Sequence, residues 1–95
     1  PMESVDSLET LVNSPFPLVG YWAATLLGRL GQSANRSQVV LGEAVSDSPH
    51  LSIRERAAWA LGKVGATEES AVESLKKAAA SDSPRLASLA ARALA

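Results

Sequence analysis

Two stretches of this sequence repeat each other, one at residues 14–31 and the other at 48–65. Both begin with Ser-Pro and share an alanine pair, a leucine and two glycines. Self-similarity on this scale is typical of repeat proteins, in which one pair of helices is copied along an axis and buries its apolar face against its neighbours. The low aromatic content, 4%, also favours helix packing over a sheet. The chain is therefore predicted to be all-α.

A third copy is predicted from Asp82-Ser83-Pro84 to Leu94. Its alanine pair corresponds to that of the second copy but lies closer to the proline, which implies two deleted residues after the proline. In each copy the serine is expected to cap a helix and the proline to occupy its first turn. Gly31 and Gly65 are expected to end the first two helices. These helices, called B helices here, are predicted from Pro15 or Pro17 to Leu30, from Pro49 or Leu51 to Val64, and from Pro84 onward.

Three further segments have apolar residues on one helical face and are predicted as the partner A helices, at about 4–13, 35–46 and from Thr67. The predicted fold is a right-handed α-α superhelix of about three two-helix repeats and six helices. The repeats fall at about 4–31, 35–65 and 67–95 of a single domain, 1–95. The Pro1-Met2 start is consistent with a fragment of a longer chain.

The middle repeat resembles a HEAT-like repeat of the phycobilisome-lyase type in Asp47-Ser48-Pro49, Ile53-Arg54 and the run 57–65. The resemblance implies a HEAT-like or armadillo-type solenoid. It also implies that a turn aspartate and an arginine early in the B helix tie neighbouring repeats together, and that B helices line a concave surface. Only the middle repeat has both residues, as Asp47 and Arg54. The other copies have different residues at one or both positions, Asn13 and Gly20 in the first, and Asp82 and Ala87 in the third.

The two sets of helices are predicted to carry opposite charge. The B helices have six cations against Glu55, a net charge of +5, while the A helices have a net charge of −4. A helical wheel places cations and aromatics on the arc away from the core. This arc and its border predict a partner-binding stripe of Tyr21, Trp22, Arg29, Arg56, Trp59, Lys63 and Arg92.

The tryptophans have a competing interpretation, in which both fill gaps between repeats and the cations form a solvated face. Trp59 lies opposite the core arc and is expected to face outward. Trp22 lies at the flank of its helix and is expected to fill a gap.

The chain lacks the residues that several classes of enzyme and metal site require. The chain has no cysteine, which excludes disulfides, thiolate nucleophiles and sulfur-bound zinc. His50 follows Asp47 and Ser48 in one turn, but a catalytic triad needs converging side chains and an oxyanion hole. No His-Glu pair and no phosphate-binding loop is present. We therefore expect no enzyme activity, cofactor or metal.

The leading hypothesis is a non-catalytic protein-protein interaction module that presents its basic and aromatic face to an acidic, partly apolar segment of another protein or of its own parent chain. The resemblance implies an alternative, an accessory subunit of a bilin lyase-like enzyme. A second alternative is a nucleic-acid-binding HEAT-like domain, which a pI of about 5.8 and a net charge of −1 disfavour. Without a signal peptide or a membrane-spanning run in this sequence, a cytoplasmic location is favoured.

Overall fold

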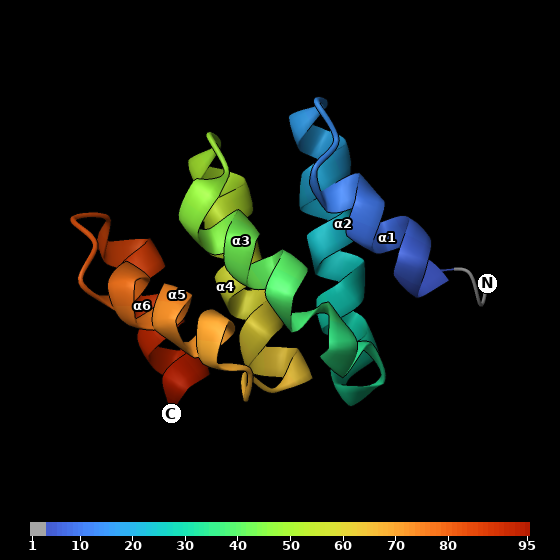
Figure 1. Cartoon of the computed structure of the whole chain (residues 1–95). Helices are drawn as coiled ribbons and strands as arrows, with labels where there is room; N and C mark the ends of the chain where they lie inside the picture. The colour runs from blue at the N-terminus through green and yellow to red at the C-terminus, as the bar shows by residue number, and fades with distance from the viewer. Residues whose placement is uncertain (1–3) are drawn as a thin grey trace.

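The structure is a computed structural model, and it describes residues 4–95. The chain forms α1 (Ser4–Val12), α2 (Pro17–Leu30), the 3-10 helix η1 (Gly31–Ser37), α3 (Gln38–Asp47), α4 (Leu51–Val64), α5 (Glu69–Ala79) and α6 (Pro84–Leu94). Figure 1 shows α1, α3 and α5 in front and the B helices α2, α4 and α6 behind them. The described part of the chain contains no strand. The predicted all-α solenoid is confirmed.

The core lies between the two layers of helices. Each A helix packs on the B helix that follows it, and along the stack α2 packs on α4, α4 on α6 and α3 on α5. The contact between α1 and α3 is small by comparison. One leucine from each of α2 to α6 is fully buried, which fills the space between the layers: Leu27, Leu41, Leu61, Leu75 and Leu86.

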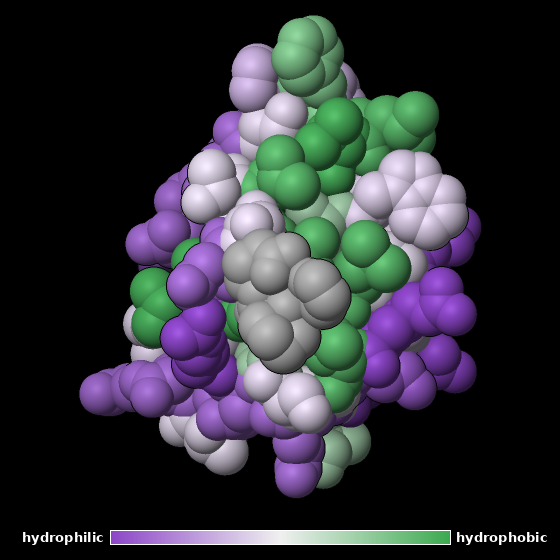
Figure 2. Space-filling model, turned by 90° about the vertical axis from the view of Figure 1, so that its right-hand side faces the viewer, coloured by the Kyte–Doolittle hydropathy of each residue, from purple (hydrophilic) through white to green (hydrophobic). Residues whose placement is uncertain are grey.

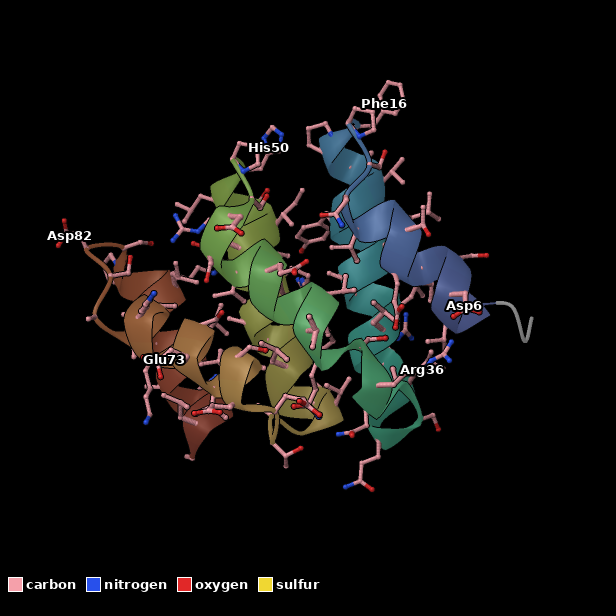
Figure 3. The ribbon with its side chains drawn as sticks, in the orientation of Figure 1. Asp6, Phe16, Arg36, His50, Glu73 and Asp82 are labelled. Carbon is pink, nitrogen blue, oxygen red and sulfur yellow. The ribbon has the colours of Figure 1, made fainter. Side chains whose placement is uncertain are left out.

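The B helices begin differently from the serine-capped starts that the sequence predicts for all three. The N-cap residues are Phe16 for α2, His50 for α4 and Ser83 for α6, and these caps make no side-chain hydrogen bond. Instead, the hydroxyl of a serine two residues earlier accepts a hydrogen bond from the N-cap backbone N–H. These serines are Ser14, Ser48 and Ser81, with donor–acceptor distances of 3.1, 3.2 and 3.0 Å. A serine hydroxyl closes such a turn locally, before the helix starts. Figure 3 shows Phe16 and His50 at the top and Asp82 at the upper left, each in the turn before its B helix.

The recurring serine turn also corrects the alignment of the third copy. Ser81, not Ser83, occupies the position of Ser48, because each lies two residues before the N-cap of its B helix. Counted from this serine, the alanine pair lies equally far along the second and third copies, so no residues are deleted after the proline. Asp82 corresponds to Pro49 and not to Asp47.

The second A helix is shorter than the predicted range 35–46. Gly31 and Gly65 end their B helices with φ of +60° and +90°, a region that favours glycine, as predicted. After Gly31 the chain continues in the 3-10 turns of η1, with a non-helical Ala34, and α3 begins only at Gln38. The buried Ala34 anchors this segment against the core.

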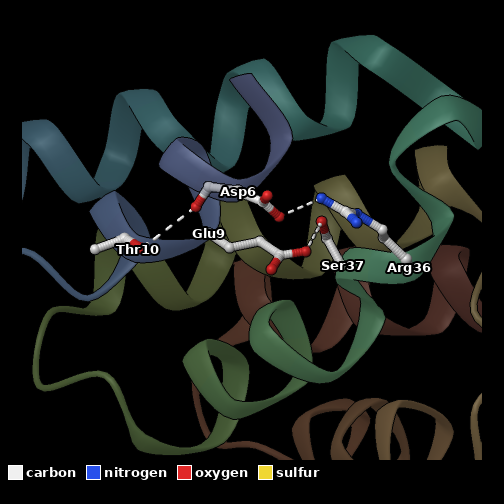
Figure 4. A network of polar contacts seen from close by, with 5 residues as sticks. All are labelled: Asp6, Glu9, Thr10, Arg36 and Ser37. Atoms are coloured by element: carbon white, nitrogen blue, oxygen red, sulfur yellow. Dashed lines mark hydrogen bonds and ion pairs between the residues drawn. The ribbon is translucent and has the colours of Figure 1, made fainter. Parts of the chain in front are cut away.

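Residues 36–38 make polar links to the neighbouring repeats, whereas the implied Arg54 bonds within its own repeat. The Arg54 Nε donates to the Val45 carbonyl at 2.8 Å, within its own repeat. The Asn35 Nδ2 also donates within this repeat, to the Val64 and Gly65 carbonyls at the end of α4, at 2.9 and 3.0 Å. Figure 4 shows the link to the first repeat, where Arg36 pairs with Asp6 and the Ser37 hydroxyl donates to Glu9 at 2.6 Å.

Candidate functional site

Arg56 on α4 lies between two aromatic rings of the B-helix layer. Its Cζ is 4.7 Å from the Tyr21 ring centroid and 4.8 Å from that of Trp59, and its Nη2 donates to the Tyr21 hydroxyl. The Lys63 Nζ lies 5.9 Å from the Trp59 centroid. Cations at these distances are attracted to the negative faces of the rings. Tyr21, Arg56, Trp59 and Lys63 therefore form one cluster, which we call the cation–aromatic cluster, across α2 and α4.

Two shallow hollows adjoin the cluster, and Trp59 and Leu89 line both of them. The first is also lined by Tyr21, Ser52, Glu55, Arg56 and Arg85, and the second by Ala58, Gly62, Lys63, Arg92 and Ala93. Glu55 lies 3.7 Å from Arg85 across the first hollow. Four cations thus line these hollows against one carboxylate, which makes this region of α4 and α6 basic with apolar patches.

The two tryptophans reverse the expectation drawn from the helical wheel. Trp59 is half-buried and packs against the core, and Trp22 is 51% exposed. A Cβ added at Gly28 of α2 would lie 2.4 Å from Trp59 Cζ3, which shows how closely the indole approaches that backbone. A helical wheel shows which side of a B helix faces its own A helix. It does not show which side faces the preceding repeat, and it is the preceding repeat that covers Trp59.

The structure brings together five of the seven residues predicted as a partner-binding stripe: Tyr21, Arg56, Trp59, Lys63 and Arg92. Arg29 is exposed in the last turn of α2 and lines neither hollow. Trp22 contacts Tyr21 edge to face, with centroids 6.4 Å apart, but lines a separate apolar hollow between α1 and α2. Sequence reasoning missed Leu89, although aligning the alanine pairs of α4 and α6 places it at the position of Arg56.

The polar residues outside this region show no arrangement that would bind a metal. His50 lies in the turn before α4 and lines a hollow with Glu43 and Asp47. Among residues 4–95, no three histidine, aspartate or glutamate side chains are placed to hold a metal ion. Within the same residues, no helix has the length and apolar character needed to cross a membrane.

Helix pairs that stack in two layers and recur along the chain define an α-solenoid repeat protein. The family model described as HEAT repeats matches residues 5–95, and the chain belongs to this family. HEAT repeats are generally protein-interaction scaffolds, and the family is typically non-catalytic. The match does not test the resemblance to the phycobilisome-lyase type, which stays a prediction. A comparison with curated proteins finds no match.

Proposed function

We propose that this chain is a non-catalytic protein-interaction module whose B-helix layer binds an acidic, partly apolar segment of another protein. The observation that carries this proposal is the cation–aromatic cluster, in which Arg56 lies between Tyr21 and Trp59. Tryptophan, tyrosine and arginine are the residue types that most often dominate the binding energy of protein interfaces.

The fixed position of the Arg56 guanidinium within the cation–aromatic cluster supports binding of a partner there. A guanidinium stacked between two rings loses little further freedom when a carboxylate binds, so association costs less conformational entropy. Arginine has five N–H donors, and its hydrogen bond to Tyr21 does not exhaust them. A carboxylate of the partner would then add charge-assisted hydrogen bonds.

The adjoining hollows explain why the partner should be partly apolar. Leu89 and the Trp59 ring provide apolar contact, while Arg56, Lys63, Arg85 and Arg92 provide positive charge around it. A segment with carboxylates on either side of leucine or phenylalanine matches this pattern. Electrostatic attraction of this kind increases the association rate and favours acidic partners over basic ones.

The test uses a synthetic helical peptide of glutamate and leucine residues with one phenylalanine. Binding is followed by the indole N–H signals of Trp59 and Trp22 in nitrogen–proton NMR spectra. The Trp59 signal is expected to shift, while the Trp22 signal moves less. The double variant K63E/R92E should weaken binding by about tenfold or more, because both reversals place a carboxylate beside the hollows.

Two matched controls make this result specific. K76E/K77E reverses two charges on exposed lysines of α5, in the other layer, and should bind the peptide as the unmodified chain does. A peptide with lysine in place of glutamate should not bind. The proposal fails if the acidic peptide leaves the Trp59 signal unchanged. It also fails if a DNA duplex displaces the bound peptide in a salt-dependent manner.

A further inference from the structure

The end of the stack formed by α1 and α2 presents an uncharged apolar face. Its hollow is lined by Leu8, Leu11, Leu18, Val19, Trp22, Ala23 and Leu26. Figure 2 looks onto this end and shows apolar side chains gathered over its upper part, with hydrophilic residues around them. We call this surface the α1/α2 end face. An exposed apolar surface with a polar rim is typical of an interaction site.

The repeats show what kind of surface fits this face. When residues 14–31 are aligned with 48–65, Val19, Trp22 and Leu26 of α2 hold the positions of Ile53, Arg56 and Ala60 in α4. In α4 these positions face the preceding repeat, because a Cβ at Gly20 would lie 3.1 Å from Ile53 Cδ1 and a Cβ at Gly28 would lie 3.0 Å from Ala60 Cα. Ile53 and Ala60 are 2% and 0% exposed, whereas Val19 and Leu26 are 37% and 40% exposed. The α1/α2 end face is therefore a repeat-stacking face without its neighbour in this structure.

The opposite end of the same chain carries the complementary surface. Ala24 in α2 and Ala58 in α4 are fully buried and occupy equivalent positions, and the equivalent residue in α6, Ala91, is exposed. Ala87 and Ser88 hold the positions of Gly20 and Tyr21, where the next repeat packs on α2. Three small, uncharged residues, Ala87, Ser88 and Ala91, thus define the α6 end face.

We propose that the α1/α2 end face of one copy of this chain stacks on the α6 end face of a second copy, head to tail. The contact continues the packing of α2 on α4 and of α4 on α6 within the chain. Large side chains on one face, Trp22 among them, meet small side chains on the other, and no charge becomes buried at these positions. Because the two faces differ, the contact leaves one of each open and can add further copies.

The test is a complementation experiment with two blocked variants, L26E on the α1/α2 end face and A91R on the α6 end face. Leu26 is 40% exposed, Ala91 is exposed, and neither belongs to the buried core. Sedimentation equilibrium measures the average molecular mass. For the unmodified chain this mass should rise with concentration from the single-chain value of 9.9 kDa to at least about twice that value. Each variant alone should stay at the single-chain mass. Their mixture should form a 1:1 dimer, because each supplies the face that the other lacks.

Each other outcome overturns the proposal. If A91R associates as the unmodified chain does, two α1/α2 end faces pair symmetrically. If the unmodified chain stays at 9.9 kDa at all concentrations, the faces do not associate. V39E is the matched control, since Val39 on α3 is 44% exposed and outside both end faces, and it should associate like the unmodified chain. Circular dichroism confirms that each variant is folded. The peptide test of the proposed function is followed by the Trp59 signal and this test by the molecular mass, so a failure of one proposal can be told from a failure of the other.

Discussion

At the scale of single residues, Trp59 packs closely on Gly28 in the B-helix layer. A Cβ at position 28 would lie 2.4 Å from the indole and 3.0 Å from Ala60 Cα. We expect G28A to destabilise the chain by about 1 kcal/mol, because an overpacking cost of about 1–3 kcal/mol exceeds the gain in helix propensity of about 1 kcal/mol. Urea unfolding followed by circular dichroism measures the change. Trp59 fluorescence should shift to longer wavelength as the ring moves toward water.

Gly62 provides the control for this substitution. It occupies the equivalent position in α4, and a Cβ there would meet Ala93 at 3.3 Å instead. G62A should therefore be close to neutral, since the same gain in propensity meets a smaller steric cost. Equal effects of G28A and G62A would show that the Trp59 contact is not the cause.

The sequence predicts the residues of the site better than their environments. The repeat alignment and a helical wheel place Tyr21, Arg56, Trp59, Lys63 and Arg92 on one layer, and the structure brings these five together. The exchange of exposure between Trp22 and Trp59 could not be foreseen, because it depends on which side of each B helix meets the preceding repeat. That side follows from the packing of α4 on α2 and not from the pattern within either helix.

At the scale of helices, Gln38 at the start of α3 holds the start of α5. Its buried amide oxygen accepts hydrogen bonds from the backbone N–H groups of Thr67 and Glu68 at 2.6 and 2.7 Å, and its Nε2 donates to the Thr67 hydroxyl at 3.1 Å. We expect Q38M, which keeps the size of the side chain, to lower the free energy of unfolding by about 1–2 kcal/mol, because these partners then lack their hydrogen bonds in a partly buried place. Thermal or urea unfolding provides the measurement.

Q32M serves as the comparison, because Gln32 is exposed in η1. The same change there leaves no buried partner without its hydrogen bond and should alter stability by less than about 0.5 kcal/mol. A loss of stability at Gln38 no larger than that at Gln32 would contradict the role assigned to the Gln38 bonds.

The existence and order of the helices could be predicted from the repeats, but the conformation of the segments that connect them could not. Leucine and alanine recur on the buried faces of the helices, as the periodicity requires. Of the two starts predicted for α2 and α4, the later ones, Pro17 and Leu51, are observed, because the Ser-Pro pair forms a turn before the N-cap and not the cap itself. Residues 31–37 were missed as a 3-10 helix because only Gly31 signals a change of backbone.

At the scale of the whole molecule, stability should vary along the stack. In a solenoid each repeat is held by its neighbours, so a helix with packing on both sides opens less readily than one at an end. α4 packs on α2, α3 and α6, while α1 packs mainly on α2 and makes only a small contact with α3.

We therefore expect backbone amides in α4 to exchange with deuterium at least about tenfold more slowly than those in α1, because α1 can detach without unfolding the middle of the stack. Hydrogen–deuterium exchange with mass spectrometry on dilute protein measures this difference, after correction for the intrinsic rates of each peptide. Dilution keeps association between end faces from protecting α1 and α2. Equal protection in α1 and α4 would mean that the stack unfolds as one unit, and that the small contact of α1 with α3 does not set the order of opening.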